Sequence, residues 1–166
     1  VNSEEICAGD AGATFTASSA AATAWQWSGN GTGTDQTTTG TAAGNYTVVV
    51  TDDNGCLSDI TLPAATGVLT VNALPTVTVN SEEICFGDAP ATFTATSATA
   101  TAWQWIDNGT GTNPTTSGTT AGDYTVIVTD ANTCKNTATG VLTVNALPRV
   151  TQFTADDINY CEGASE

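Results

Sequence analysis

The feature that most constrains this chain is an internal repeat. Residues 1–56 align with residues 79–134 at a constant offset of 78, without a gap, and 42 of the 56 aligned pairs are identical. The segment GVLTVNALP at 67–75 returns at 140–148 with an offset of 73, so the second copy is five residues shorter. Repetition over this length is typical of an array of similar modules, each of which packs against its neighbours.

The repeat predicts the domain organisation. We expect a first unit over residues 1–73 that lacks the opening strand of the module, a second over residues 74–146, and the first strand region of a third over residues 147–166. We interpret the chain as part of a longer array. A unit of roughly 75 residues lies near the lower limit for an independent hydrophobic core, so a covalent cross-link is expected in each.

Charge excludes several classes of partner. The chain has 17 acidic residues, two basic residues and no histidine, which gives a formal net charge of −15. Nucleic-acid binding needs lysine and arginine to displace counterions, and docking on anionic membranes needs basic clusters, so we expect neither. The sequence has no run of about 20 apolar residues, and we expect no membrane insertion.

Alternating residues in the second copy predict short β-strands. They are expected at 76–79 (with 83–85 as its end or a short continuation), 92–95, 103–105, 124–130 and 141–145, with two weak strands inside 110–120. No segment combines helical periodicity with helix caps. Seven short strands separated by turns predict an all-β fold of tandem immunoglobulin-like β-sandwiches, with one disulfide per repeat.

Large aromatic residues are few, and we expect each unit to need them in its core. Tyr46 and Tyr124 follow a Gly-x-Tyr pattern that predicts a tyrosine corner. The expected core residues are Trp25, Trp27, Tyr46, Phe93, Trp103, Trp105 and Tyr124. An alternative role for the tryptophan pairs is a surface on which carbohydrate rings stack.

The five cysteines indicate disulfides and an oxidising compartment. Cys7 and Cys56 are separated by 49 positions, as are Cys85 and Cys134. The simplest pairing is therefore Cys7–Cys56 and Cys85–Cys134, which leaves Cys161 without a partner in this segment. Reduced thiols and a zinc site are the alternatives, but the chain has no Cys-x-x-Cys pair and no histidine. Disulfides place the protein outside the cytosol.

The combined motifs resemble a known family. The strings ICxGDxxATFTA, WQW, AGxYTVxVTDxxxC and VLTVNALP resemble the immunoglobulin-like and PKD-like tandem repeats of giant Bacteroidota surface proteins, such as gliding adhesins and other type IX-secreted proteins. The resemblance covers nearly all of residues 1–148. It implies a long extracellular protein of the bacterial cell surface, used for adhesion or as a filament shaft, and it brings no catalytic residues.

Little in the sequence points to chemistry. Without histidine, neither a Ser-His-Asp nor a Cys-His arrangement is available, so we expect no enzyme. Acidic residues near expected loop ends make Ca²⁺ the alternative to having no cofactor, with Glu82, Glu83 and Asp130 as weak candidate ligands. The simpler interpretation of these residues is solvated acidic loops.

The linkers predict how the units are joined. Asn-Ala-Leu-Pro at 72–75 and 145–148 is short and ends in proline, which indicates a stiff joint between neighbouring repeats. We therefore expect a stalk or filament shaft of a secreted bacterial adhesin or extracellular fibre. The partners would be neighbouring repeats of the same chain and, through exposed strand edges, a homo-oligomeric bundle or fibre. The alternative function is a glycan- or cell-binding adhesion module. The segment 147–166 packs within its own chain or completes a sheet in a neighbouring chain.

Overall fold

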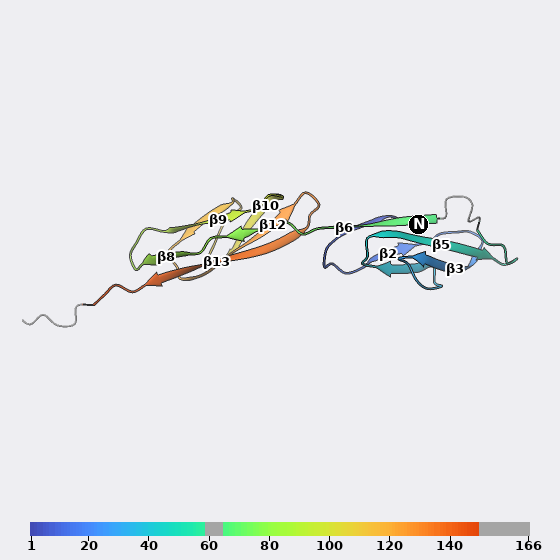
Figure 1. The fold of residues 1–166 in the computed structure, drawn as a ribbon, viewed down its shortest axis with the longest axis horizontal. Helices are drawn as coiled ribbons and strands as arrows, with labels where there is room; N and C mark the ends of the chain where they lie inside the picture. The colour runs from blue at the N-terminus through green and yellow to red at the C-terminus, as the bar shows by residue number, and fades with distance from the viewer. Residues whose placement is uncertain (59–64, 150–166) are drawn as a thin grey trace, which may run out of the picture.

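The computed structural model describes residues 1–58 and 65–149, and all regular secondary structure in these ranges is β-strand (Figure 1). The strands of the first unit are β1 (Glu4–Cys7), β2 (Ala13–Thr16), β3 (Ala22–Gly29), β4 (Thr37–Gly40), β5 (Gly44–Asp52) and β6 (Ala65–Asn72). Those of the second unit are β7 (Thr78–Val79), β8 (Glu82–Cys85), β9 (Ala91–Thr96), β10 (Ala100–Asp107), β11 (Thr115–Gly118), β12 (Gly122–Asp130) and β13 (Lys135–Asn145).

Each unit has two sheets. In the second unit one sheet has the order β10-β12-β13-β8 and the other has the order β11-β9-β7. In the first unit the orders are β1-β6-β5-β3 and β2-β4. All pairs are antiparallel except β1 with β6 and β8 with β13, which are parallel. The predicted all-β, immunoglobulin-like sandwich is confirmed.

The chain changes sheet early in the second unit. Thr78 and Val79 pair with β9 in one sheet, whereas residues from Glu82 onward pair with β13 in the other. The segment 83–85, expected to end the first strand or continue it briefly, therefore belongs to a separate strand in the opposite layer. The Thr/Gly-rich segment 110–120 forms one strand, β11, instead of the two weak strands expected there.

Two separate hydrophobic cores lie between these sheets. Residues at alternating positions point inward, since successive strand side chains face opposite sides of a sheet. The buried members in the first unit are Ala13, Phe15, Ala17, Trp27, Tyr46, Val48 and Leu69, and in the second unit Ala91, Phe93, Ala95, Trp105, Tyr124, Val126, Val128 and Leu142. Trp25 and Trp103 are half-buried and pack against the two cores from their edges.

Each core is organised around a stacked aromatic pair. The rings of Phe15 and Tyr46 lie 4.1 Å apart, and those of Phe93 and Tyr124 lie 4.0 Å apart. The hydroxyl of Tyr124 donates a hydrogen bond to the carbonyl oxygen of Thr120, four residues earlier, at 3.1 Å. The hydroxyl of Tyr46 makes the equivalent bond to Ala42. This geometry is that of a tyrosine corner, which fixes the start of β5 and β12.

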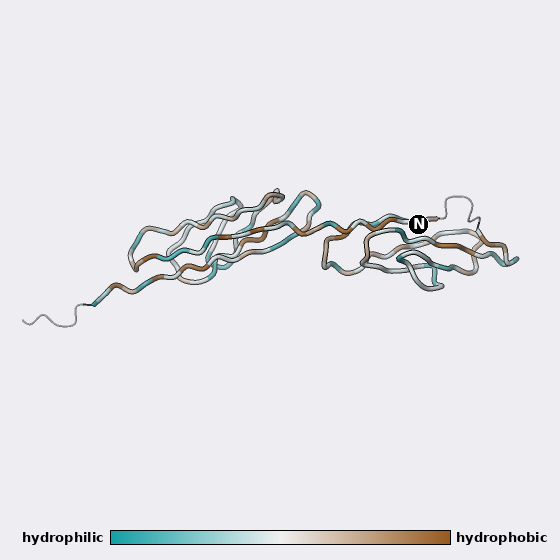
Figure 2. Tube along the Cα trace, viewed as in Figure 1, coloured by the Kyte–Doolittle hydropathy of each residue, from teal (hydrophilic) through white to brown (hydrophobic). Residues whose placement is uncertain are grey.

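The two units lie end to end along the longest axis of the molecule, and β6 leads through a short linker into the second unit (Figure 1). Along both units hydrophobic stretches are short and alternate with hydrophilic ones (Figure 2). Within the described ranges, no helix is long and apolar enough to cross a membrane.

Candidate functional site at the joint between the units

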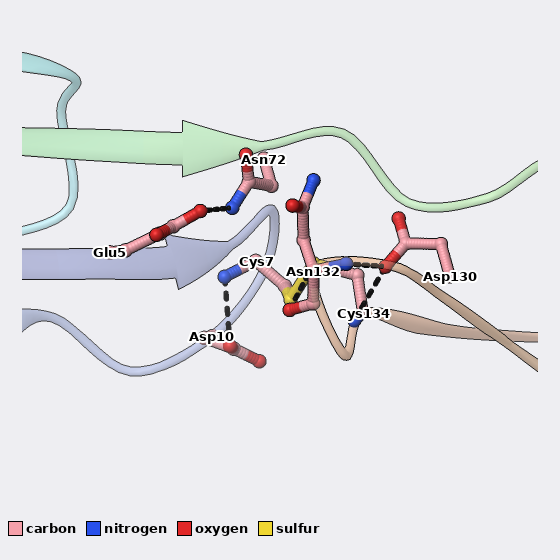
Figure 3. The surroundings of a disulfide bond; sticks show 7 residues. All are labelled: Glu5, Cys7, Asp10, Asn72, Asp130, Asn132 and Cys134. Atoms are coloured by element: carbon pink, nitrogen blue, oxygen red, sulfur yellow. Dashed lines mark hydrogen bonds between the residues drawn. A yellow bond between two sulfur atoms is a disulfide. The ribbon is translucent and has the colours of Figure 1, made fainter. Parts of the chain in front are cut away.

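A disulfide bond joins the two units. Cys7 is the last residue of β1, and Cys134 lies directly before β13, 127 positions later in the sequence (Figure 3). Their Cα atoms are 5.5 Å apart, within the range of roughly 4.4–6.8 Å that a disulfide requires. The bond therefore crosses the joint and connects the end of one sandwich to the facing end of the next.

The predicted pairings Cys7–Cys56 and Cys85–Cys134 are wrong, and strand direction is the reason. Cys7 is level with Asn72, where β6 ends, because β1 runs parallel to β6. Cys56 follows β5, which runs antiparallel to β6, so it lies at the other end of the same sheet. The nine residues of β5 span about 30 Å at roughly 3.3 Å each. No disulfide can close that distance.

The same relationship holds in the second unit. Cys85 is level with Asn145 at the end of β13, whereas Cys134 precedes the start of that strand. Cys56 and Cys85 are free thiols, and both are exposed. Cys161, expected to lack a partner in this segment, lies outside the described residues. The expectation of one disulfide within each repeat is therefore replaced by one disulfide between two repeats.

Cys134 is held by an aspartate-centred turn. A side-chain oxygen of Asp130 accepts hydrogen bonds from the backbone N–H groups of Asn132 and Cys134, both at 2.9 Å (Figure 3). The backbone N–H of Asp130 donates to the carbonyl oxygen of Cys134 at 3.0 Å. Asp130 thus positions the cysteine through its side chain and its backbone.

Cys7 is held by a second turn of this kind. Its backbone N–H donates to a side-chain oxygen of Asp10 at 3.0 Å, and its carbonyl oxygen accepts from the N–H of Asp10 at 3.1 Å. Next to it, the N–H of Ala8 donates to the carbonyl oxygen of Asn72 at 2.8 Å. The parallel pairing of β1 with β6 therefore continues to the edge of the joint.

The linker contributes its own contact. Pro75 is fully buried, and its carbonyl oxygen accepts a hydrogen bond at 2.8 Å from the side-chain amide of Asn136 on β13. Proline fixes one backbone dihedral of the linker. The joint is therefore spanned by the backbone and by the disulfide, and Asn136 ties the linker to the second unit.

The turns around the free cysteines match those around the bonded ones. The N–H of Cys56 donates to a side-chain oxygen of Asp52 at 2.8 Å, and the N–H of Cys85 donates to one of Asp88 at 2.9 Å. The bonds to the backbone N–H groups of Cys56 and Asn54 lower the pKa of the Asp52 carboxyl below its usual value, Cys56 having the larger effect. Burial acts in the opposite direction and is outweighed.

The acidic residues considered for Ca²⁺ are not brought together. Glu82 and Glu83 lie on β8, level with the second half of β13, whereas Asp130 ends β12 at the opposite end of that sheet. Asn80 donates to the carboxylate of Glu82, and Asn145 donates to that of Glu83. Within residues 1–58 and 65–149, no three acidic or cysteine side chains are grouped to hold a metal ion.

A signal for the actual pairing was present in the sequence. The cysteine of EEIC is the last residue of the parallel edge strand, and the second cysteine comes four residues after the strand that starts with Gly-x-Tyr. Once EEIC is assigned to a separate strand beside the last strand, the two cysteines of one repeat must lie at opposite ends of the sheet. The equal 49-residue spacing carried no information about distance.

Comparisons with known proteins found distant similarity in structure and none in sequence. No protein-family model matches the chain, and no curated protein sequence matches it significantly. Fibronectin(III)-like modules of Clostridium thermocellum CbhA are similar in structure, at 18% identity and a TM-score of 0.41 over 93% of this chain and 96% of that one. A human PKD domain is similar at 19% identity and a TM-score of 0.33, over 49% of this chain and 90% of that one. Bacteroides ovatus SGBP-B, solved with a mixed-linkage heptasaccharide, is similar at 14% identity and a TM-score of 0.31. The match covers 86% of this chain and 43% of that one. Similarity at this level carries no argument about this chain.

Proposed function

We propose that this chain is a structural segment, a stalk or filament shaft, of a long secreted bacterial surface adhesin or extracellular fibre. The observation that carries the proposal is the Cys7–Cys134 disulfide, which connects one unit to the next. A cross-link within a unit would stabilise that unit alone. A cross-link between units stiffens the joint and transmits force along the row.

The position of the bond gives a short covalent path for tension. When the two ends of the chain are pulled, force passes along residues 1–7, through the disulfide, and onward from Cys134. The intervening segment lies outside this path. It contains both tyrosine corners and most of both cores, so while the bond is intact tension acts on β1 and β13 but not on the strands between them in the sequence.

The placement of the four tryptophans supports a shaft over a module that stacks sugars on these rings. Stacking on sugars requires exposed aromatic faces. Trp27 and Trp105 are buried, and Trp25 and Trp103 pack against the cores. Their rings are thus used for stability. We further propose that the chain has no catalytic activity, since the candidate site consists of a disulfide, two thiols and hydrogen-bonded turns.

The same bond supports an extracellular location. Disulfides persist in oxidising compartments and are rare in the cytosol. Assignment to the bacterial cell surface and to type IX secretion rests on the motif resemblance. The large negative charge keeps neighbouring shafts apart in solution, and bundling into a fibre would need screening of that charge.

Single-molecule force spectroscopy tests the proposal. With handles at the two termini, the oxidised chain should show no unfolding steps from the segment between Cys7 and Cys134. Reduction should add steps that release roughly 450 Å in total, at about 3.6 Å for each residue of the 127-residue separation.

Cys7→Ser should behave like the reduced chain without any reductant, whereas Cys56→Ser should retain the short path. An oxidised wild-type chain that extends as far as the reduced one would show that the bond does not carry the load.

A further inference from the structure

Cys85 has the same backbone setting as the bonded Cys7. Each is the last residue of the parallel edge strand of its unit. Each donates its N–H to the side chain of an aspartate three residues later, at 3.0 Å for Cys7 and 2.9 Å for Cys85. The residue after each cysteine donates its N–H at 2.8 Å to the carbonyl oxygen of the asparagine that ends the neighbouring strand. Cys85 is therefore positioned in the second unit as Cys7 is positioned in the first.

The turn around the other bonded cysteine, Cys134, also recurs in the repeat. Cys56 and Cys134 each donate their N–H to the side chain of the aspartate four residues earlier, at 2.8 and 2.9 Å. That aspartate donates its N–H to the carbonyl oxygen of the cysteine, at 3.1 Å for Cys56 and 3.0 Å for Cys134. Because Cys56 is a free thiol, the turn forms without a bond to the sulfur. Every repeat with this sequence thus presents its second cysteine in the same way.

The sequence places a further unit after Cys85, as it places the second unit after Cys7. Leu147-Pro148 repeats Leu74-Pro75, and an acidic pair precedes Cys161 as one precedes Cys85. The linker before this further unit follows β13, just as the linker before the second unit follows β6. The joint after the second unit is therefore built from the same linker and the same kind of cysteine as the joint before it.

Apolar surface lies beside Cys85 at this next joint. Phe86 is 69% exposed, and with Val144, Leu147 and Pro148 it lines a shallow pocket of about 390 Å³. A second shallow pocket is lined by Cys85 itself together with Phe86 and Val144. At the first joint the linker proline and the second cysteine of the following unit are buried. A unit that docks in the same way after β13 would cover both pockets.

We propose that Cys85 forms a disulfide with the second cysteine of the unit that begins at Leu147, the residue equivalent to Cys134. The aspartate-centred turn that carries this cysteine occupies the pockets beside Cys85. Every unit is then bonded to the unit that follows it, and no unit is bonded within itself. This inference deepens the proposed shaft function and rests on it, because it extends the bond of one joint to the whole array.

The bond forms by oxidation of two thiols. The thiolate of Cys85 attacks a small disulfide oxidant such as oxidised glutathione, which releases one reduced glutathione. The thiolate of the partner cysteine then displaces the glutathione bound to Cys85. The balance is two protein thiols plus one oxidised glutathione giving one protein disulfide plus two reduced glutathiones.

The proposed bond gives the second unit two short load-bearing segments. One covalent path runs from Pro75 through β7 and β8 to Cys85, and the other runs from Cys134 along β13 to the next linker. Since β8 and β13 pair in parallel, both segments run in the same direction along the row and share the load. The strands β9 to β12, which hold most of the core, lie outside both paths.

A chain extended by one unit tests the proposal. A second copy of residues 74–146, which includes the whole core of the second unit, is placed directly after residue 146. Ala89→Ser and Thr137→Ser in the added copy, both at exposed positions, give its two cysteine peptides distinct masses. The chain is oxidised in a glutathione redox buffer, free thiols are alkylated, and peptides are mapped without reduction.

The expected map contains the Cys7–Cys134 bond and a bond from Cys85 to the second cysteine of the added copy. Cys56 and the first cysteine of the added copy should be alkylated, because neither has a facing unit in this chain. Cys85→Ser should remove only the second of the two bonds.

The pocket beside Cys85 is tested in the same extended chain. Phe86→Ser should lower the equilibrium constant for the second bond about tenfold, since it removes apolar surface from the contact. The Cys7–Cys134 bond serves as the internal reference and should not change. Val141→Ser, which changes a 44% exposed residue of β13 outside these pockets, should leave both bonds unchanged.

A map in which Cys85 is free, or is bonded to any other cysteine, would overturn the proposal, whether or not Cys7–Cys134 has formed. The shaft function is judged separately by the force experiment, which depends on Cys7 and Cys134 alone.

Discussion

The side-chain amide of Asn136 donates a hydrogen bond to the carbonyl oxygen of Pro75 at 2.8 Å, across 61 positions of sequence. Asn136 is two residues after Cys134, on the strand that begins at the disulfide. Pro75 is the last residue of the linker and is fully buried. The backbone connection and the disulfide are thus anchored at neighbouring points of one strand, which restricts bending at the joint.

Replacement of Asn136 by alanine should loosen the joint. It would leave the buried carbonyl of Pro75 without its donor, at a cost of about 1–3 kcal/mol in the free energy of unfolding of the second unit. Thermal denaturation measures this loss. Thr137→Ala changes the adjacent exposed residue and should cost less than about 0.5 kcal/mol. Equal effects of the two changes would contradict a role for the Asn136 contact.

The two tryptophans of β10 should differ in their response to phenylalanine. The indole N–H of Trp105 donates to the carbonyl oxygen of Asn113 at 2.9 Å, whereas that of Trp103 is buried without a partner among the described residues. Trp105→Phe leaves a carbonyl unsatisfied, whereas Trp103→Phe removes an unsatisfied donor. We expect Trp105→Phe to destabilise the chain by about 1–3 kcal/mol more than Trp103→Phe in chemical denaturation.

The first unit allows an independent test of the same comparison. Trp27 donates to the carbonyl oxygen of Asp35 at 2.9 Å, and the N–H of Trp25 is buried without a partner in the described ranges. Trp27→Phe should therefore cost more than Trp25→Phe. The opposite order in either unit would mean that ring volume, rather than the hydrogen bond, decides the cost.

The architecture was predictable because each local signal agreed with the fold. Alternation in YTVIVTD, the Gly-x-Tyr pattern and the turn residues all favour short antiparallel strands. The boundary between the strands at Thr78–Val79 and Glu82–Cys85 was not predictable in this way. Both segments alternate, and only packing decides that the chain crosses from one sheet to the other between them.

The cysteine pairing could not be obtained from spacing. Whether Cys7 bonds to Cys56 or to Cys134 depends on which end of a sheet each occupies, and that is a property of strand direction. Equal spacing in two repeats is satisfied by pairing within a repeat and by pairing between repeats. The grouping of the candidate Ca²⁺ ligands could not be obtained from the sequence for a related reason. Strand direction places Glu82 and Asp130 at opposite ends of one sheet.

The turn before Cys134 contains a residue with a strained backbone, and a substitution should remove the strain. Thr133 has a φ of 65°, where β-branched residues are rare, and the first unit has Gly55 with a φ of 78° at the equivalent position. Thr133→Gly should raise the free energy of unfolding by about 1 kcal/mol, and Gly55→Thr should lower it by a similar amount. Chemical denaturation of the two variants checks both signs. Thr133→Ala retains a β-carbon and should change stability less, so equal gains from glycine and alanine would contradict this explanation.

The turn before Cys56 should make stability depend on pH. The backbone N–H groups of Cys56 and Asn54 hold the pKa of the Asp52 carboxyl below its usual value. A carboxyl whose pKa is lower in the folded state contributes stability that is fully present above its unfolded pKa and is lost as pH falls through its folded pKa. NMR titration of the side-chain carboxyl carbon should therefore give a midpoint below that of an ordinary aspartate. Asp52→Asn retains a side-chain oxygen that accepts the same hydrogen bonds, but the amide does not titrate. The part of the acid-induced loss of stability that comes from Asp52 should therefore disappear in this variant. A midpoint at or above the ordinary value would show that the turn does not stabilise the charged form.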